Sequence, residues 1–168
     1  MNPNLQVEET RDADLVWKIA SSPEVMDRIS NDEWTALGDH VRRTHVGIIT
    51  RKPENHIILV LDGKRPVGCF VMDAKKDGLF EIHTFLLKSC RGADAIQAGK
   101  MAMAFAFRLP ETQKLISYCP GNNPESYLFA RLCGWHKAGV AAFKWVKDGI
   151  SYPLRIVEIS RKDLCPSQ

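Results

Sequence analysis

The chain of 168 residues is long enough for one domain with a full hydrophobic core and short for two, so we expect a single domain over residues 1–168. Its hydrophobic share of 45%, charged share of 26% and net charge of +3 are those of an ordinary globular protein, with neither the basic stripe of a nucleic-acid binder nor an apolar run that could span a bilayer. Five widely spaced cysteines without a CxxC pair indicate no metal site, and an N-terminus without a signal pattern predicts a cytoplasmic protein.

The first part of the chain is predicted to be mainly helical. Residues 5–9 are typical of a short strand, and residues 12–20 of a helix that Asp12 caps. A second helix over residues 22–29 begins with Ser-Pro-Glu, which combines a capping hydroxyl, a first-turn proline and a charge that suits the helix dipole. Residues 31–45 have weak periodicity, so we expect a loop or a broken helix there.

Residues 57–87 are predicted to form an antiparallel meander. Three apolar, β-rich runs cover residues 57–61, 66–72 and 79–87. The turn signals Asp62-Gly63 and Asp77-Gly78 separate them, and such signals join consecutive strands into hairpins.

The rest of the chain alternates helices and strands. The pattern predicts a largely buried helix over residues 94–108, a strand over 114–119, a helix over 125–132 and a hairpin of 141–146 with 151–159. Since crossover helices join parallel strands, the strands on either side of the first helix are expected to pair in parallel. The expected fold class is α/β (α+β), with a mixed central sheet of about six to seven strands flanked by about four helices.

Three motifs in this order resemble the GNAT superfamily of acetyl-CoA-dependent N-acetyltransferases. They are the hairpin of residues 59–68, a strand followed by Arg91-Gly92 and a helix, and the segment from Asn123 to Trp135, which resembles the family pattern N-x-x-A-x-x-φ-Y-x-x-x-G-F with φ apolar. The resemblance covers nearly the whole chain. It implies the GNAT fold, acetyl-CoA as cofactor, and a small-molecule or protein amine as acceptor. Residues 81–92 with the third motif are also similar to small GNAT-like proteins of tailed phages, some of which take part in virion assembly.

The resemblance places the pyrophosphate of CoA on the loop Arg91-Gly92-Ala93-Asp94-Ala95, with Arg91 as the main contact. The free N–H groups and partial positive charge of a helix N-terminus favour a phosphate, and small residues permit close approach. The family has glycines at the positions of Asp94 and Ile96. Asp94 therefore either repels the pyrophosphate or turns outward and caps the helix. The backbone of Leu86 and Leu87 is implied to hold the pantetheine.

Acetyl transfer to an amine requires a group that accepts a proton from the nucleophile. By strand alternation, Glu81 and His83 share one face with Phe85 and Leu87. Burial on this apolar face would suit a carboxylate to the role of general base, and the resemblance implies that role for Glu81. The alternatives are a salt bridge or a solvent-facing position for Glu81, and a hydrogen-bonded structural role for His83.

The third motif suggests the remaining site residues. The tyrosine with which many GNAT enzymes protonate the leaving thiolate is replaced by Ala130, so Tyr127 on the same predicted helix and Tyr118 on the preceding strand are candidates for that role. Asn123 and Ser126 match the asparagine and alanine of the family and are implied to line the pantetheine channel. Asn123 would equally serve as a turn and helix-cap residue.

The predicted function is direct acetyl transfer from acetyl-CoA to an amine. The acceptor is expected to bind beside residues 12–45, where Asp32, Glu33 and Trp34 suit a cationic amine. The departures from the family pattern motivate two alternatives, a catalytically degenerate GNAT-fold phage protein with an assembly or binding role, and an acyl-CoA sensor. Exposed edge strands in the last hairpin could pair in a homodimer.

Overall fold

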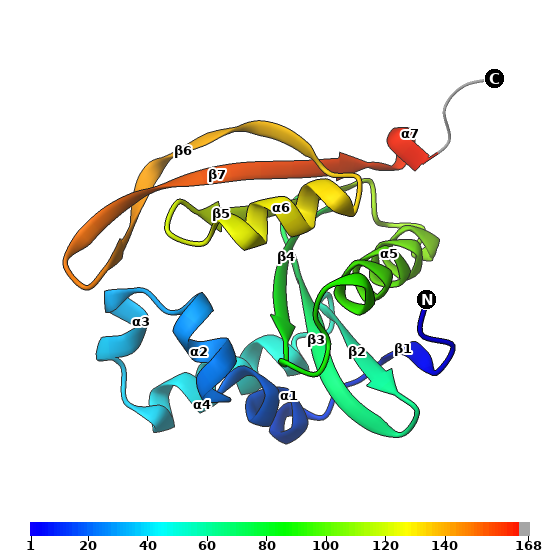
Figure 1. Ribbon diagram of the computed structural model, residues 1–168, viewed down its shortest axis with the longest axis horizontal. Coiled ribbons are helices and arrows are strands. Elements are labelled where there is room, and N and C mark those ends of the chain that lie inside the picture. Colours follow the sequence, from blue (N-terminus) through cyan, green and yellow to red (C-terminus); the bar gives the residue numbers. More distant parts are fainter. Residues whose placement is uncertain (165–168) are drawn as a thin grey trace.

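The computed structural model describes residues 1–164, and one mixed sheet forms its centre (Figure 1). The seven strands lie in the order β1-β2-β3-β4-β5-β7-β6. All neighbouring strands are antiparallel except β4 and β5, which confirms the predicted meander and the predicted parallel pair. The strand bounds are β1 Leu5–Glu9, β2 His56–Asp62, β3 Arg65–Ala74, β4 Leu79–Leu86, β5 Lys114–Pro120, β6 His136–Lys147 and β7 Ile150–Ser160.

Helices connect and cover these strands. None of the helices within residues 1–164 is both long enough and apolar enough to cross a membrane. Their bounds are α1 Ala13–Ala20, α2 Pro23–Ile29, α3 Asp32–Ala36, α4 Asp39–Arg51, α5 Ala93–Arg108, α6 Pro124–Leu132 and α7 Arg161–Leu164.

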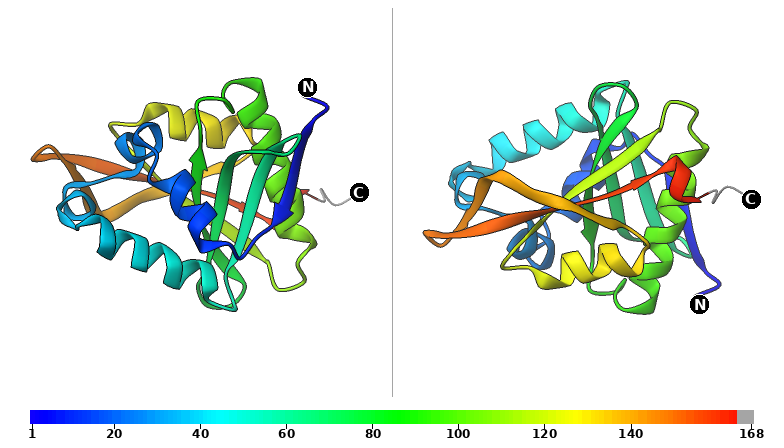
Figure 2. Two further views of the ribbon diagram at one scale, coloured as in Figure 1. Left: turned by 90° about the horizontal axis from the view of Figure 1, so that it is seen from below. Right: turned by 90° about the horizontal axis from the view of Figure 1, so that it is seen from above.

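Two hydrophobic cores lie on opposite faces of β2 and β3, because alternate residues of a strand point to opposite sides. Ile58 and Val60 belong to the core that α5 and α6 cover, whereas Ile57 and Leu59 belong to the core that α1 and α4 cover. In Figure 2, α4 and α5 accordingly lie on different sides of the first four strands. The sheet is therefore covered on both faces, and the site must form where this covering opens.

Gly99 allows α5 to pack closely against α6. A Cβ at this position would lie 2.6 Å from Cys133 Sγ and 2.8 Å from the ring of Phe129. Even a methyl group here would force these side chains, or the helices that carry them, to shift, so glycine suits their close approach. Cys133 is one of the cysteines that are free and buried in residues 1–164, whereas Cys165 lies outside the described residues.

Residues 31–45 are more regular than expected. The Asn31 side chain accepts a hydrogen bond of 2.7 Å from the Trp34 N–H and caps α3, and α4 then runs to Arg51. The buried residues of α4 begin at Val46, beyond the window in which the periodicity is weak. The last hairpin is also longer than predicted, because two register shifts interrupt the alternation along β6.

Candidate active site

The sheet opens between β4 and β5, and this opening organises the site. The two strands pair over three residues, the last of which are Glu81 and Ile116, although both strands continue further. At the fork, the Ser117 hydroxyl donates a hydrogen bond of 2.8 Å to the Ile82 carbonyl. Beyond this point β4 pairs only with β3, and β5 pairs only with β7. Alternate backbone groups of β4 therefore face the opening.

A cavity of about 1240 Å³ passes through the opening. Residues of α5, α6 and the loop after β4 line one part of it, which we call the α5 half. Residues of α1, α3, α4 and β6 line the other part, the α1 half. In Figure 1, α6 and the β6–β7 hairpin lie in the upper part of the view and α1–α4 in the lower part. The volume exceeds the roughly 300–1,000 Å³ that a single small-molecule site usually needs, so a large ligand and a second molecule have room to meet.

The α5 half has the features of an anion site. Arg91, Gly92, Ala95 and Ile96 line the cavity there. Gly92 has a φ of 59° and precedes α5, and no side chain caps the helix, so its first N–H groups have no partner within it. Burial and the neighbouring Arg28 lower the pKa of Arg91. A bound anion would relieve the repulsion between the two guanidinium groups.

Asp94 lies outside this lining. The lining positions 92, 95, 96 and 99 follow helical spacing, whereas Asp94 and Ala93 are not among them. Asp94 therefore does not form part of the cavity wall. It does not cap the helix, because Gly92 occupies the N-cap position without a side-chain hydrogen bond. The carboxylate thus stands beside the anion site without facing the cavity.

The two leucines at the end of β4 differ in what they offer a ligand. The Leu87 N–H donates to the Val67 carbonyl at 3.0 Å, and the Leu87 carbonyl accepts from the Cys90 N–H at 2.9 Å. Of the two leucines implied to hold the pantetheine, Leu87 therefore has its N–H and its carbonyl already paired within the chain. Because Leu87 pairs with β3, the backbone groups of Leu86 point into the opening, and Leu86 lines the cavity.

The start of α6 contributes Asn123 and Ser126 to the cavity wall. The Asn123 side chain accepts from the Ser126 N–H at 3.2 Å, and the Ser126 hydroxyl donates to the Asn123 carbonyl at 2.7 Å. Asn123 is therefore a helix cap, and it also lies where the resemblance implied a channel residue.

The tyrosine on α6 does not face the cavity. Tyr127 is absent from the lining, and its ring centroid lies 5.1 Å from the Arg155 guanidinium. It is thus badly placed to protonate a leaving group, which corrects that expectation. Tyr118 on β5 lines the cavity instead, with its ring centroid 5.5 Å from that of Phe143. Its hydroxyl is the better candidate for an acid, on the side of the opening opposite to β4.

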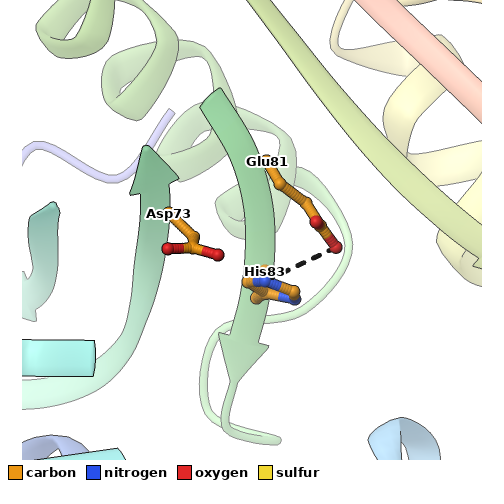
Figure 3. A group of neighbouring side chains, drawn as sticks. All are labelled: Asp73, Glu81 and His83. Atoms are coloured by element: carbon orange, nitrogen blue, oxygen red, sulfur yellow. Dashed lines mark ion pairs between the residues drawn. The ribbon is translucent and has the colours of Figure 1, made fainter. Parts of the chain in front are cut away.

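Four polar side chains meet on the cavity floor in the α1 half, and Figure 3 shows three of them. Asp73 on β3 lies opposite Glu81 on β4. Lys75 Nζ lies 2.6 Å from Asp73 Oδ2 and 3.1 Å from Glu81 Oε2. His83 Nε2 lies 3.5 Å from Glu81 Oε1. Glu81 and His83 therefore share the predicted face, and Glu81 is also salt-bridged.

His83 has the properties of a proton acceptor. Burial lowers the pKa of His83, and the attraction of Glu81 and Asp73 offsets this only in part. Since 39% of its side chain is exposed at the cavity, the ring is both enclosed by protein and accessible to a ligand. The imidazole is neutral at pH 7 and can accept a proton.

The same cluster contains side chains of the kinds that bind metal ions. Asp73, Glu81 and His83 have ligand atoms within 4.8 Å of one another, a combination that could hold a divalent ion. The Lys75 ammonium already binds both carboxylates and supplies the positive charge that such a cluster needs. We therefore interpret the cluster as an ion-pair network that holds an acid–base pair.

Sequence reasoning missed Asp73, Lys75 and Arg28. The hairpin register could have revealed the first two, because the short turn before β4 places Asp73 opposite Glu81. Arg28 forms an ion pair with Glu125 across 97 residues of chain, and no local pattern indicates such a contact.

No protein-family model and no curated protein sequence matches the chain. Solved structures do match it. Spermidine N-acetyltransferase from Vibrio cholerae, in complex with CoA and spermine, is 12% identical with a TM-score of 0.78, over 96% of this chain and 98% of that one. RimL, a ribosomal L7/L12 α-N-protein acetyltransferase in complex with coenzyme A, is 14% identical with a TM-score of 0.73, over 94% of each chain. A structure described as a putative acetyltransferase is 18% identical with a TM-score of 0.70, over 98% of this chain and 87% of that one. In this chain the sheet is open between β4 and β5, the two strands on either side of the cavity. The chain therefore has the GNAT fold.

Proposed function

We propose that the protein transfers the acetyl group of acetyl-CoA directly to a primary amine. The observation that carries the proposal is the cavity through the parted strands, with an anion site in its α5 half and a neutral histidine in its α1 half. The likeness to structures that contain CoA supports the choice of cofactor. The protein is further proposed to work in the cytoplasm.

The residues of the α5 half fit the parts of CoA. Arg91 and the free N–H groups at the start of α5 suit the pyrophosphate, and Gly92 and Ala95 leave it room. The backbone of Leu86 faces the opening and can pair with the amides of an extended pantetheine arm. When bound, acetyl-CoA supplies an activated acyl group at the fork of the sheet.

The chain's own groups move the protons. An alkylammonium ion cannot attack, so the amine nitrogen must lose a proton before or during bond formation. The neutral His83 imidazole accepts it, and the carboxylates of Glu81 and Asp73 stabilise the imidazolium that forms. Tyr118, on the other side of the opening, is placed to donate a proton to the departing thiolate.

The proposal is tested by titrating acetyl-CoA into the protein in a calorimeter and by measuring thiol release with a panel of amines. Binding accompanied by amine-dependent thiol release is expected. A bound ligand must also raise the melting temperature. The absence of binding at millimolar acetyl-CoA would refute the proposal.

A second candidate is a catalytically degenerate GNAT-fold protein with a binding role, such as assembly of a tailed phage or acyl-CoA sensing. Two copies of this protein would pair as a homodimer through the last hairpin. The observation that favours it is Ile96, whose side chain lines the cavity at a position that the family pattern gives to glycine. Binding of acetyl-CoA without thiol release across the whole amine panel would support this candidate over the enzyme.

The loop after β4 gives a matched pair of variants. Arg91→Gln is expected to weaken acetyl-CoA binding roughly 10- to 100-fold, because charge-assisted hydrogen bonds to phosphate are lost. Asp94→Asn is expected to change the dissociation constant by less than about twofold, since its carboxylate does not face the cavity. Calorimetry on both variants checks this. A large gain in affinity for Asp94→Asn would show that the carboxylate does repel the pyrophosphate.

The two tyrosines give a second matched pair. Tyr118→Phe is expected to lower kcat roughly 100-fold, the usual contribution of a general acid. Tyr127→Phe should leave kcat unchanged, because that ring packs against Arg155 outside the cavity. Steady-state thiol release measures both, and the opposite ranking would return the acid role to Tyr127.

A further inference from the structure

Aromatic rings line the α1 half of the cavity from several directions. They come from helices on one side and from the β5 and β6 strands on the other, and two of them are already in an edge-on contact, with the Trp34 and His45 centroids 5.4 Å apart. Phe143 is 58% exposed although it is apolar. The rings include Trp17, Trp34, His45, Tyr118, Phe143 and Trp145. A flat apolar ligand would bury these surfaces against itself.

The charge of the same half fits one positive group. Its carboxylates are Glu33, Asp73 and Glu81, and its ammonium groups are Lys75 and Lys144. Lys75 binds both Asp73 and Glu81, which leaves little negative charge free to hold further cations. With His83 neutral, this half carries a net charge near −1, enough for a single ammonium group that tryptophan faces can also attract.

The tip of the β6–β7 hairpin is hydrogen-bonded to two of the helices whose residues line the cavity. The Asp32 carboxylate on α3 accepts hydrogen bonds from the Asp148 and Gly149 N–H groups at 2.7 and 2.9 Å. Lys147 also donates to the Asp27 carbonyl. These bonds tie the tip of the β6–β7 hairpin to α2 and α3, and Figure 1 shows the tip beside α3. The bonds hold together the elements that carry Trp34, Phe143 and Trp145. A compact acceptor suits walls held in this way better than a long flexible one.

From these three observations we infer that the acceptor is a small primary monoamine with an aromatic body. This inference rests on the proposed function. The ammonium group first gives one proton to His83, and the neutral nitrogen then forms a bond to the acetyl carbon as the carbon–sulfur bond breaks. Tyr118 gives its proton to the departing thiolate, and the second proton of the nitrogen restores Tyr118. The products are an N-acetylated arylalkylamine and CoA.

The inference is tested with amines of matched size. For the protein supplied with acetyl-CoA, kcat/KM for tryptamine and 2-phenylethylamine is expected to exceed that for 2-cyclohexylethylamine about tenfold, because the saturated ring has the same charge but cannot stack. Spermidine and a peptide with a free N-terminus should react more slowly than any of these. Equal or better turnover of spermidine or of the peptide would overturn the inference while leaving the proposed function intact.

Binding provides a readout that does not depend on turnover. With CoA present, calorimetry should give a lower dissociation constant for tryptamine than for 2-cyclohexylethylamine or spermidine. Trp145→Leu should remove the preference for the aromatic ring and leave 2-cyclohexylethylamine binding within about twofold. The absence of such a preference in the unmodified protein would overturn the inference. Failure to bind acetyl-CoA would instead refute the proposed function.

Discussion

Replacing His83 with glutamine is expected to lower kcat by roughly 10²- to 10⁴-fold, the range in which general bases contribute. Glutamine keeps a polar side chain of similar reach but cannot accept the proton. Calorimetry should show acetyl-CoA affinity within about twofold of the unmodified protein, because His83 lies on β4 in the half of the cavity away from Arg91. Activity retained within a few-fold would exclude His83 as the base and return the role to Glu81.

The pH dependence gives a second test of His83. Burial lowers the pKa of His83 below the ordinary 6.5, so the base stays neutral into mildly acidic solution. Activity is therefore expected to be present at neutral pH and to fall as the pH drops through this lowered pKa, which places the midpoint of the acid limb of kcat/KM below 6.5. An acid limb centred well above 6.5 would contradict the assignment.

Lys75 supplies the control for this interpretation. Its positive charge is one of the causes that lower the pKa of His83. Lys75→Met leaves Asp73 and Glu81 without their cation, so the imidazolium is favoured and the acid limb should move to higher pH. A purely structural role for His83 would not produce a shift in this direction.

Asn55→Ala is expected to lower the free energy of unfolding by about 2–4 kcal/mol, because two backbone groups lose their hydrogen-bond partner. Asn55 is completely buried. Its side chain accepts from the Ala74 N–H at 2.8 Å and donates to the Ile49 carbonyl at 3.0 Å, so it ties β3 to α4. For a chain of this length the melting temperature should fall by roughly 5–15 °C, as measured by circular dichroism.

The exposed Asn122 provides the matched control. Asn122→Ala removes the same side chain from the surface and should change the free energy of unfolding by less than about 0.5 kcal/mol. An equal fall in the free energy of unfolding in the two variants would show that the hydrogen bonds of Asn55 do not contribute to stability.

The structure could be predicted best from the sequence where a regular geometry of strands and their connections decides which residues lie together. Alternation along one strand placed Glu81 and His83 on a common face, and the crossover helix predicted the parallel pairing of β4 with β5. Both conclusions depend only on geometry that every strand shares.

Prediction was poorer where rotation about a helix or contact between distant segments decides the outcome. Tyr127 was predicted on the correct helix. Successive positions of a helix differ in direction by about 100°, and Tyr127 faces Arg155 and not the cavity. The partnership of Lys75 with Glu81 depends on hairpin register, and that of Arg28 with Glu125 on the packing of distant helices.

The separation of β4 and β5 gives this sheet two internal edges in addition to its outer ones. Unpaired strand edges attract other strands and promote aggregation when they face solvent. Here they face each other across a fork that the Ser117–Ile82 hydrogen bond keeps closed at one end. On one face of the fork, α5 and α6 pack closely against each other at Gly99. The peptide groups inside are thereby withheld from self-association and remain available to a thin, extended ligand that carries amides of its own.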